Sequence, residues 1–293
     1  MSEPAEVTPA LLRGMPLPFP SPDGDKEARG RVLVVGGSAQ VPGAVRLAGE
    51  AALQAGAGKL QMAVPESVSV QLGLLVPEGR VFALAERDGE IAPDAAGTIL
   101  EFAAKCDALL VGPGMMGKPA AAELTQRLLE AADGPGLVID AAAMAACWAR
   151  PDLVRKHDGR VVLTPHAGEM AGLTGASKEA VEADPLGAAR EAARELGAVL
   201  ALKGQRTFIA APNGRGWRHE GHAVGLATSG SGDVLAGVIA GLLARGAAPE
   251  QAALWGVFLH QQAGRRLSER VGPLGFLARE LAGQIPGLLA EFG

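Results

Sequence analysis

A glycine-rich segment that ends in an acid is the part of this chain best suited to chemistry. It reads Gly230-Ser231-Gly232-Asp233 and continues into an apolar stretch of helical spacing, residues 233–244. Glycines allow consecutive backbone N–H groups to point toward one ligand, and the positive end of a helix favours negative charge. The segment predicts an anion site in which the Asp233 carboxylate can accept a proton from a substrate hydroxyl.

The same four residues are also compatible with a simpler role, in which Ser231 or Asp233 only caps a helix that follows flexible glycines. A P-loop is disfavoured because the chain contains no Gly-Lys-Ser or Gly-Lys-Thr sequence. The dinucleotide-binding pattern is disfavoured as well, since Gly36-Gly37-Ser38 supplies only part of it. Polar turns after five predicted strands favour the anion site over the simple cap.

Two polar side chains follow apolar runs elsewhere in the chain. Lys203, before Gly204, could place a cation or a backbone donor against a phosphate, although a lysine at a strand end is also typical of a solvated terminus. His166 could bond a ligand, or it could begin a helix with Glu169 closing a capping box. Neither residue decides the function by itself.

No pattern in the chain is typical of a metal site, because His157, His219, His222 and His260 lack ligand spacing. Cys106 and Cys147 are too far apart and too few for a zinc site or a disulfide scaffold, and we expect both to be small buried residues. The pair Met115-Met116 is expected in a wall or in the core.

Short β-branched runs alternate with alanine- and leucine-rich runs of helical period, which is typical of βαβ units. The predicted strands are 31–35, 60–64, 81–84, 108–111, 137–139, 161–163 and 199–202, with a hairpin formed by 207–210 and the Asn213-Gly214 turn. The predicted helices are 42–55, 94–105, 119–132, 167–173, 184–196, 233–244, 250–270 and 276–284. The fold class is therefore α/β, a doubly wound and mainly parallel sheet with helices on both faces.

Ligands of such sheets bind outside the carboxyl ends of the strands. Glycines, prolines and polar residues follow five of the predicted strands, at 36–38, 112–114, 140, 164–166 and 203–204. The sequence thus predicts one site at one edge of the sheet.

Composition narrows the class of ligand. The 293 residues carry a formal net charge of −5, and only 3% are aromatic, with no tyrosine. Neither a basic excess nor aromatic platforms are available for DNA or RNA, so a nucleic-acid partner is not expected. No apolar run approaches the roughly 20 residues of a membrane span, and no basic, apolar leader begins the chain. We expect a cytoplasmic protein with no membrane partner, composed of a proline-rich surface arm, residues 1–30, and one domain, residues 31–293, whose core begins at Arg31.

Several segments together resemble the NAD(P)H-hydrate dehydratase family of the ribokinase-like superfamily. The resemblance extends from about Arg31 to Pro286 and is carried by VLVVGGSAQVPGAVRLAGEAALQAGAGKLQMAVPES, LLVGPGM, LVIDAAAM, VVLTPHAGEM, LALKGQRTFIA and GLATSGSGDVLAGVIAGLLARG. The GSGD element alone is shared by many kinases of the superfamily. The order TPHAGE, LKG and GLATSGSGDVL is specific to the family.

The resemblance implies a ribokinase-like fold and an ADP-dependent lyase that restores NADH or NADPH from the (S)-hydrate, NADHX or NADPHX, with release of AMP and phosphate. It implies that Asp233 is the base on the hydroxyl and also contacts the substrate, together with Ala44, Gly114 and His166. It assigns the adenine nucleotide to the backbone and side chains of Lys203, Gly204, Gln205, Arg206, Thr207, Gly230, Ser231 and Gly232. Mg²⁺ is implied on the phosphates of ADP, or of ATP as the donor.

The resemblance further implies a homotetramer and, as a functional partner, a separate epimerase protein, because thirty leading residues are too few for an epimerase domain. The chain departs from the family at Ala223-Val224, where an asparagine turn is common, and at Ala142, where a second acid is common. These departures keep two alternatives open, a small-molecule hydroxyl kinase of the same superfamily and a catalytically silent nucleotide-binding protein.

Overall fold

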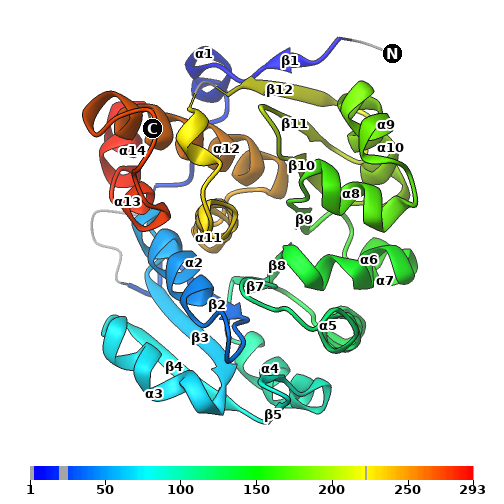
Figure 1. Cartoon of the computed structure of the whole chain (residues 1–293), viewed down its shortest axis with the longest axis vertical. Helices are drawn as coiled ribbons and strands as arrows, with labels where there is room; N and C mark the ends of the chain where they lie inside the picture. The colour runs from blue at the N-terminus through cyan, green and yellow to red at the C-terminus, as the bar shows by residue number, and fades with distance from the viewer. Residues whose placement is uncertain (1–2, 20–25, 222, 293) are drawn as a thin grey trace.

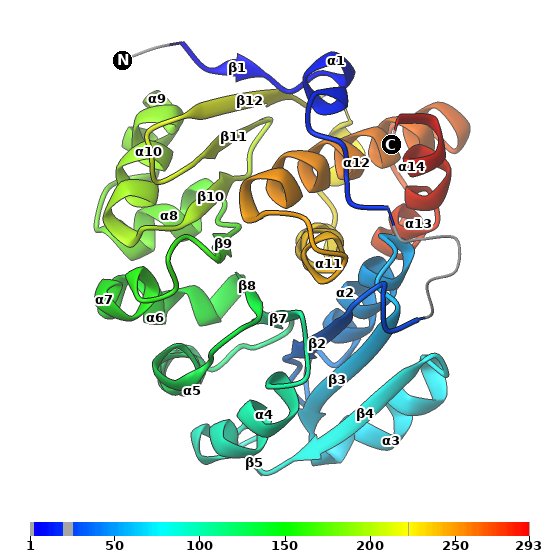
Figure 2. The ribbon, with the colours of Figure 1, turned by 180° about the vertical axis from the view of Figure 1, so that it is seen from behind.

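The computed structural model of the chain describes residues 3–19, 26–221 and 223–292. Ten strands form one sheet in the order β1-β12-β11-β10-β9-β8-β7-β2-β3-β4 (Figures 1 and 2). The strands are β1 (Ala5–Glu6), β2 (Arg31–Val35), β3 (Lys59–Pro65), β4 (Gly79–Leu84), β7 (Ala108–Val111), β8 (Gly136–Ile139), β9 (Val161–Leu163), β10 (Val199–Leu202), β11 (Arg206–Ala210) and β12 (Gly216–Glu220). A separate hairpin joins β5 (Glu86–Arg87) to β6 (Glu90–Ile91).

The seven strands from β10 to β4 in this order are parallel to one another, whereas β11 is antiparallel to β10 and to β12. Strand β10 is buried along its length, as expected for a parallel strand covered on both faces. The predicted hairpin is present, with its turn beside Asn213-Gly214. The α/β class and the mainly parallel sheet are therefore confirmed.

Helices cover both faces of the sheet, and each face has its own apolar core. On one face lie α2 (Gly43–Gln54), α3 (Glu66–Leu75), α11 (Ser231–Ala244), α12 (Pro249–Arg270), α13 (Ala278–Ala282) and α14 (Ile285–Phe292). On the other lie α4 (Ala96–Ala103), α5 (Lys118–Ala131), α6 (Ala145–Ala149), α7 (Pro151–Arg155), α8 (Ala167–Thr174), α9 (Lys178–Ala183) and α10 (Pro185–Leu196). Single 3-10 turns occupy Pro93–Ala95, Ala141–Met144 and Val224–Leu226.

The apolar core does not begin at Arg31, so that prediction is wrong. Residues near the N-terminus form β1, which pairs with β12, and a short helix, α1 (Pro9–Arg13). Leu12 is fully buried in the core beneath α12, and the Trp255 indole N–H donates to the carbonyl of Met15 at 2.8 Å. Two residues of strand are too short a run to show alternation in the sequence.

The predicted helix 276–284 is also wrong in its bounds, because the chain forms two helices there. Helix α13 ends at Ala282, and α14 begins at Ile285 and continues beyond the predicted end. Pro286 is tolerated because it lies in the first turn of α14, where its missing N–H has no intrahelical acceptor. The two cysteines are buried and free, as expected, and Met115 is buried while Met116 is exposed.

Candidate active site

The loops after β2 and β7 meet at the carboxyl edge of the sheet. The N–H of Gly37 donates to the carbonyl of Pro113 at 2.6 Å, which holds the two loops together. Gly114 has a φ of +72°, and a Cβ there would lie 2.4 Å from Val41 O and 3.0 Å from the Ala44 Cβ. The structure thus brings together two predicted substrate positions, Ala44 and Gly114, and their tight contact leaves no space for a side chain on Gly114.

The predicted anion loop lies at the start of α11. Gly230 has a φ of +86°, a conformation that glycine adopts without strain, and the helix begins at Ser231. The first N–H groups of any helix lack intrahelical acceptors, so those of Gly232 and Asp233 are available to an anion at this end. Helix α11 is buried along nearly its whole length, which fixes the direction of these donors.

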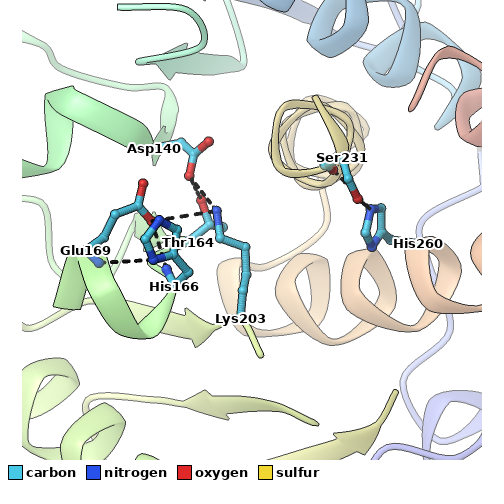
Figure 3. A network of polar contacts seen from close by, with 7 residues as sticks. All are labelled: Asp140, Thr164, His166, Glu169, Lys203, Ser231 and His260. Atoms are coloured by element: carbon cyan, nitrogen blue, oxygen red, sulfur yellow. Dashed lines mark hydrogen bonds and ion pairs between the residues drawn. The ribbon is translucent and has the colours of Figure 1, made fainter. Parts of the chain in front are cut away.

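A cluster of charged side chains lies beside this loop, as Figure 3 shows. Lys203 follows β10, and its Nζ is 3.1 Å from Asp140 Oδ1 and 4.0 Å from Glu169 Oε2. The same Asp140 oxygen accepts a hydrogen bond from the Thr164 hydroxyl at 2.6 Å. A Cβ on Gly232 would lie 3.2 Å from the Lys203 ammonium, so the cation borders the helix start. Three neighbouring strand ends therefore meet at one buried carboxylate.

The electrostatics of the cluster favour a base at Asp233. Burial, followed by the negative charge of Asp140, raises the pKa of Asp233 to about 7, although Lys203 acts in the opposite direction. Burial alone would lower the pKa of Lys203, but the carboxylates of Asp140 and Glu169 outweigh it and raise that pKa overall. Near neutral pH, Lys203 is charged and Asp233 exchanges its proton readily, which suits general base catalysis.

His166 lies next to this cluster and caps a helix. The ring Nδ1 of His166 accepts the backbone N–H of Glu169 at 3.1 Å. The Glu169 carboxylate accepts the backbone N–H of His166 at 2.8 Å, which completes the capping box that the sequence allowed. The His166 side chain remains 58% exposed at the carboxyl edge of the sheet. The cap therefore fixes the ring without removing it from the site.

The predicted nucleotide segment, residues 203–207, begins in the loop after β10 and enters strand β11 in its second half. Gly204 and Gln205 are exposed, and the Arg206 side chain already pairs with Glu220 across the hairpin, with 2.9 Å between Nε and Oε2. Thr207 is only 3% exposed and lies within β11. The structure thus keeps the Lys203 ammonium beside the anion loop, while the cation of Arg206 lies in the hairpin.

Four residues of the site were not singled out as site residues from the sequence. Asp140 and Thr164 lie in turns noted at strand ends, and that position was the available signal. Glu90 accepts backbone N–H groups of Met116 and Gly117, at 3.2 and 3.0 Å, and so ties the β5–β6 hairpin to the loop after Gly114. His260, which contacts Ser231, gave no signal in the sequence.

Within residues 3–19, 26–221 and 223–292, no three His, Cys, Asp or Glu side chains are grouped closely enough to hold a metal ion. The same described residues contain no helix that is long and apolar enough to cross a membrane.

Comparisons with known proteins agree with this geometry. A family model described as NAD(P)H-hydrate dehydratase matches residues 32–287. The ADP-dependent (S)-NAD(P)H-hydrate dehydratase of Xanthomonas campestris is 50% identical over 97% of this chain and 95% of its own length. The bifunctional NAD(P)H-hydrate repair enzyme of Moorella thermoacetica is 40% identical, but the chain spans only 53% of that protein.

Two solved structures are similar to this chain over nearly its whole length. The ADP/ATP-dependent NAD(P)H-hydrate dehydratase of Bacillus subtilis, co-crystallised with ATP and Mg²⁺, aligns over 100% of both chains with a TM-score of 0.84 and 30% identity. A ribokinase-like superfamily protein of Enterococcus faecalis is 24% identical and aligns over 99% of this chain, also with a TM-score of 0.84. The latter likeness shows the ribokinase-like fold alone.

Proposed function

The chain belongs to the NAD(P)H-hydrate dehydratase family, and we propose that it repairs nicotinamide nucleotides by ADP-dependent dehydration of (S)-NAD(P)H-hydrate. The products are NAD(P)H, AMP and phosphate. The observation that carries the proposal is Asp233, a partly buried carboxyl with a pKa of about 7 at the N-terminal end of α11. A base with that pKa beside helix N–H donors suits transfer of a phosphoryl group to a hydroxyl.

In this reaction Asp233 accepts the proton of the substrate hydroxyl while the terminal phosphoryl group of ADP moves to that oxygen. The N–H groups of Gly232 and Asp233 stabilise the charge on the moving group, and Lys203 contributes a cation nearby. The carbon–oxygen bond then breaks and phosphate leaves with its electron pair. Loss of a proton from the adjacent ring carbon to solvent forms the double bond and restores the reduced nicotinamide ring. A site built as a kinase therefore achieves a net loss of water.

We assign the remaining residues by their positions around this centre. Ala44, Gly114 and His166 would contact the hydrated dinucleotide, which is supported by the contact of Gly114 with Ala44 and by the exposed ring of His166. The nucleotide would lie along Lys203, Gly204, Gln205, Arg206 and Thr207 and against the loop Gly230, Ser231 and Gly232. The exposure of Gly204 and Gln205 next to Lys203 supports this placement.

Magnesium fits the site as an ion carried by the nucleotide. Mg²⁺ keeps several waters and is usually bound by substrate phosphates with one or two carboxylates, rather than by a cage of protein ligands. When bound, the ion would neutralise charge on the phosphates.

We also propose a cytoplasmic homotetramer that depends on a separate epimerase protein to supply the (S)-hydrate. The two buried free thiols suit a reducing compartment. The bifunctional relatives, of which this chain matches about half, support a functional link between two activities.

The function is tested by incubating the purified protein with NADHX, Mg²⁺ and either ADP or ATP. We expect absorbance at 340 nm to rise with ADP, and one phosphate to appear for each NADH formed. An absorbance trace that stays flat with either nucleotide would contradict the proposal. A product that retains the phosphate would instead identify a hydroxyl kinase of the same superfamily.

A further inference from the structure

A buried histidine on α12 contacts the first residue of the anion-loop helix. His260 is 6% exposed and Ser231 is 5% exposed. The His260 Nε2 lies 3.0 Å from the Ser231 carbonyl oxygen and 3.0 Å from the Ser231 hydroxyl (Figure 3). Two residues 29 positions apart in the sequence are thus joined directly at the anion loop.

The chemistry of this contact fixes the protonation of the ring. A carbonyl oxygen can only accept a hydrogen bond, so the Nε2 of His260 must carry a hydrogen. Burial lowers the pKa of His260 to about 4, so the ring is neutral near pH 7. The Ser231 hydroxyl shares the same N–H as an acceptor and keeps its own hydrogen for another acceptor. A phosphoryl oxygen at the helix start is an acceptor of the required kind.

The backbone of α12 approaches this segment closely on both sides of His260. Positions 256, 260 and 264 are four residues apart, so they lie on one face of the helix. A Cβ on Gly256 would lie 2.5 Å from Ile239 Cγ1 of α11, and a Cβ on Gly264 would lie 2.5 Å from Leu226 Cγ. A Cβ at either position would force these side chains to shift. Helix α12 is therefore held against residues 226–239, and His260 lies at the centre of the contact.

We propose that His260 is a positioning residue that holds Ser231, and with it the N–H groups of Gly232 and Asp233, in the orientation that binds the phosphoryl group of the nucleotide. The inference rests on the proposed function, because it takes the anion to be the phosphate of ADP. His260 itself touches no substrate. Affinity for ADP should therefore depend on the Nε2–H donor, whereas affinity for the hydrate should not.

The test compares His260→Leu with His260→Gln in the full chain, with ADP binding measured by calorimetry and the KM for NADHX measured at saturating ADP. Leucine fills the space without a donor, and we expect the Kd for ADP to rise about tenfold, the effect of leaving a buried acceptor unpaired. The Gln side-chain N–H reaches a position close to that of the His Nε2, so His260→Gln should bind ADP within about threefold of wild type. The KM for NADHX should stay within about twofold for both variants.

Leu259→Val is the matched control, since Leu259 is the fully buried neighbour on the same helix. It should lower the melting temperature and leave the Kd for ADP unchanged. The proposal is overturned if His260→Leu binds ADP as tightly as wild type, or if Leu259→Val weakens ADP equally. Should His260→Leu not fold, His260→Asn replaces it, because its shorter amide cannot reach Ser231, and equal ADP binding by the Asn and Gln variants overturns the proposal.

Failure of the proposed function gives a different result. A wild-type protein that binds ADP but forms no NADH would contradict the dehydratase activity, and the ADP dissociation constants of the variants would still decide the role of His260. A wild-type protein that does not bind ADP would overturn both.

Discussion

The Lys203 ammonium lies 3.1 Å from Asp140 Oδ1, so the cation that borders the anion loop is already paired with a buried carboxylate. The groups around Asp233 are this pair and the carboxylate of Glu169. Asp140 and Lys203 act on Asp233 in opposite directions. The protonation of the base is therefore set by a balance that single substitutions can shift either way.

Asp140→Asn removes a negative charge that raises the pKa of Asp233. That pKa should fall below its value of about 7, and the acid limb of the kcat/KM profile should move to lower pH by about 0.5–1 unit. The maximal rate should also fall, since Lys203 and Thr164 keep only a neutral amide oxygen in place of the carboxylate that both contact. A profile with an unchanged limb and a reduced plateau would show that Asp140 only shapes the site.

Lys203→Met removes the positive charge that lowers the pKa of Asp233, so it should shift the acid limb the other way, to higher pH. The KM for ADP should rise as well, because the cation that borders the proposed phosphate site is lost. The two variants control for each other, because a purely structural defect would lower activity without shifting the acid limbs of the two profiles in opposite directions. Acid limbs that shift in the same direction would contradict the opposing effects of Asp140 and Lys203 on the pKa of Asp233.

Asp233→Asn keeps the size of the side chain and removes the proposed base. We expect kcat to fall about a hundredfold or more, the usual contribution of a positioned general base. The Kd for ADP should change little, because the N–H donors of the loop remain. Turnover near the wild-type rate in this variant would show that another group accepts the proton.

The same variant should be more stable than wild type above neutral pH. The folded-state pKa of Asp233 is raised from its ordinary value of 3.8 to about 7, so the folded protein holds the proton more tightly than the unfolded chain. That stabilisation is complete below about pH 4 and is lost as the pH rises through 7. The gain from Asp233→Asn should be absent near pH 3 and reach at least ~1 kcal/mol at pH 8 in urea unfolding. A gain independent of pH would contradict this account.

The elements that were predicted correctly are those determined by residues adjacent in the sequence. The strand Arg31–Val35 and the loop Gly230-Ser231-Gly232-Asp233 are defined by the types and order of adjacent residues, and both lie where predicted. The helix bounds at Ala167 and Leu196 follow from a capping residue and a following glycine, which are also local signals. A sequence contains these signals whatever the rest of the chain does.

The contacts that build the charge balance are not local. Asp140 and Lys203 are 63 residues apart and meet because β8 and β10 both flank β9. Periodicity does not give the order of strands, so it could not predict this pair. His260 lies in a helix whose pattern predicts burial but not the partner of a buried polar group.

Gly114→Ala tests the substrate side of the site. Its φ of +72° and the 2.4 Å approach to Val41 O both oppose a Cβ, so the loop must move away from Ala44. The KM for NADHX should rise about tenfold or more while the Kd for ADP stays unchanged. Gly134→Ala is the control, because Gly134 has a φ of +100° with no atom within 4 Å of a Cβ. Equal effects of the two variants on the KM would contradict the substrate assignment.

Leu12→Ala tests whether the N-terminal segment belongs to the core. Leu12 is fully buried with α12, and the backbone after it accepts hydrogen bonds from Gln251 and Trp255. Truncating a buried leucine leaves a cavity and should cost about 2–5 kcal/mol in the free energy of unfolding, measured in urea. Leu11→Ala, at the partly buried neighbour, should cost less. An arm that merely lay on the surface would give two equal and small losses, so a large difference between these variants would show that folding of the domain includes its first residues.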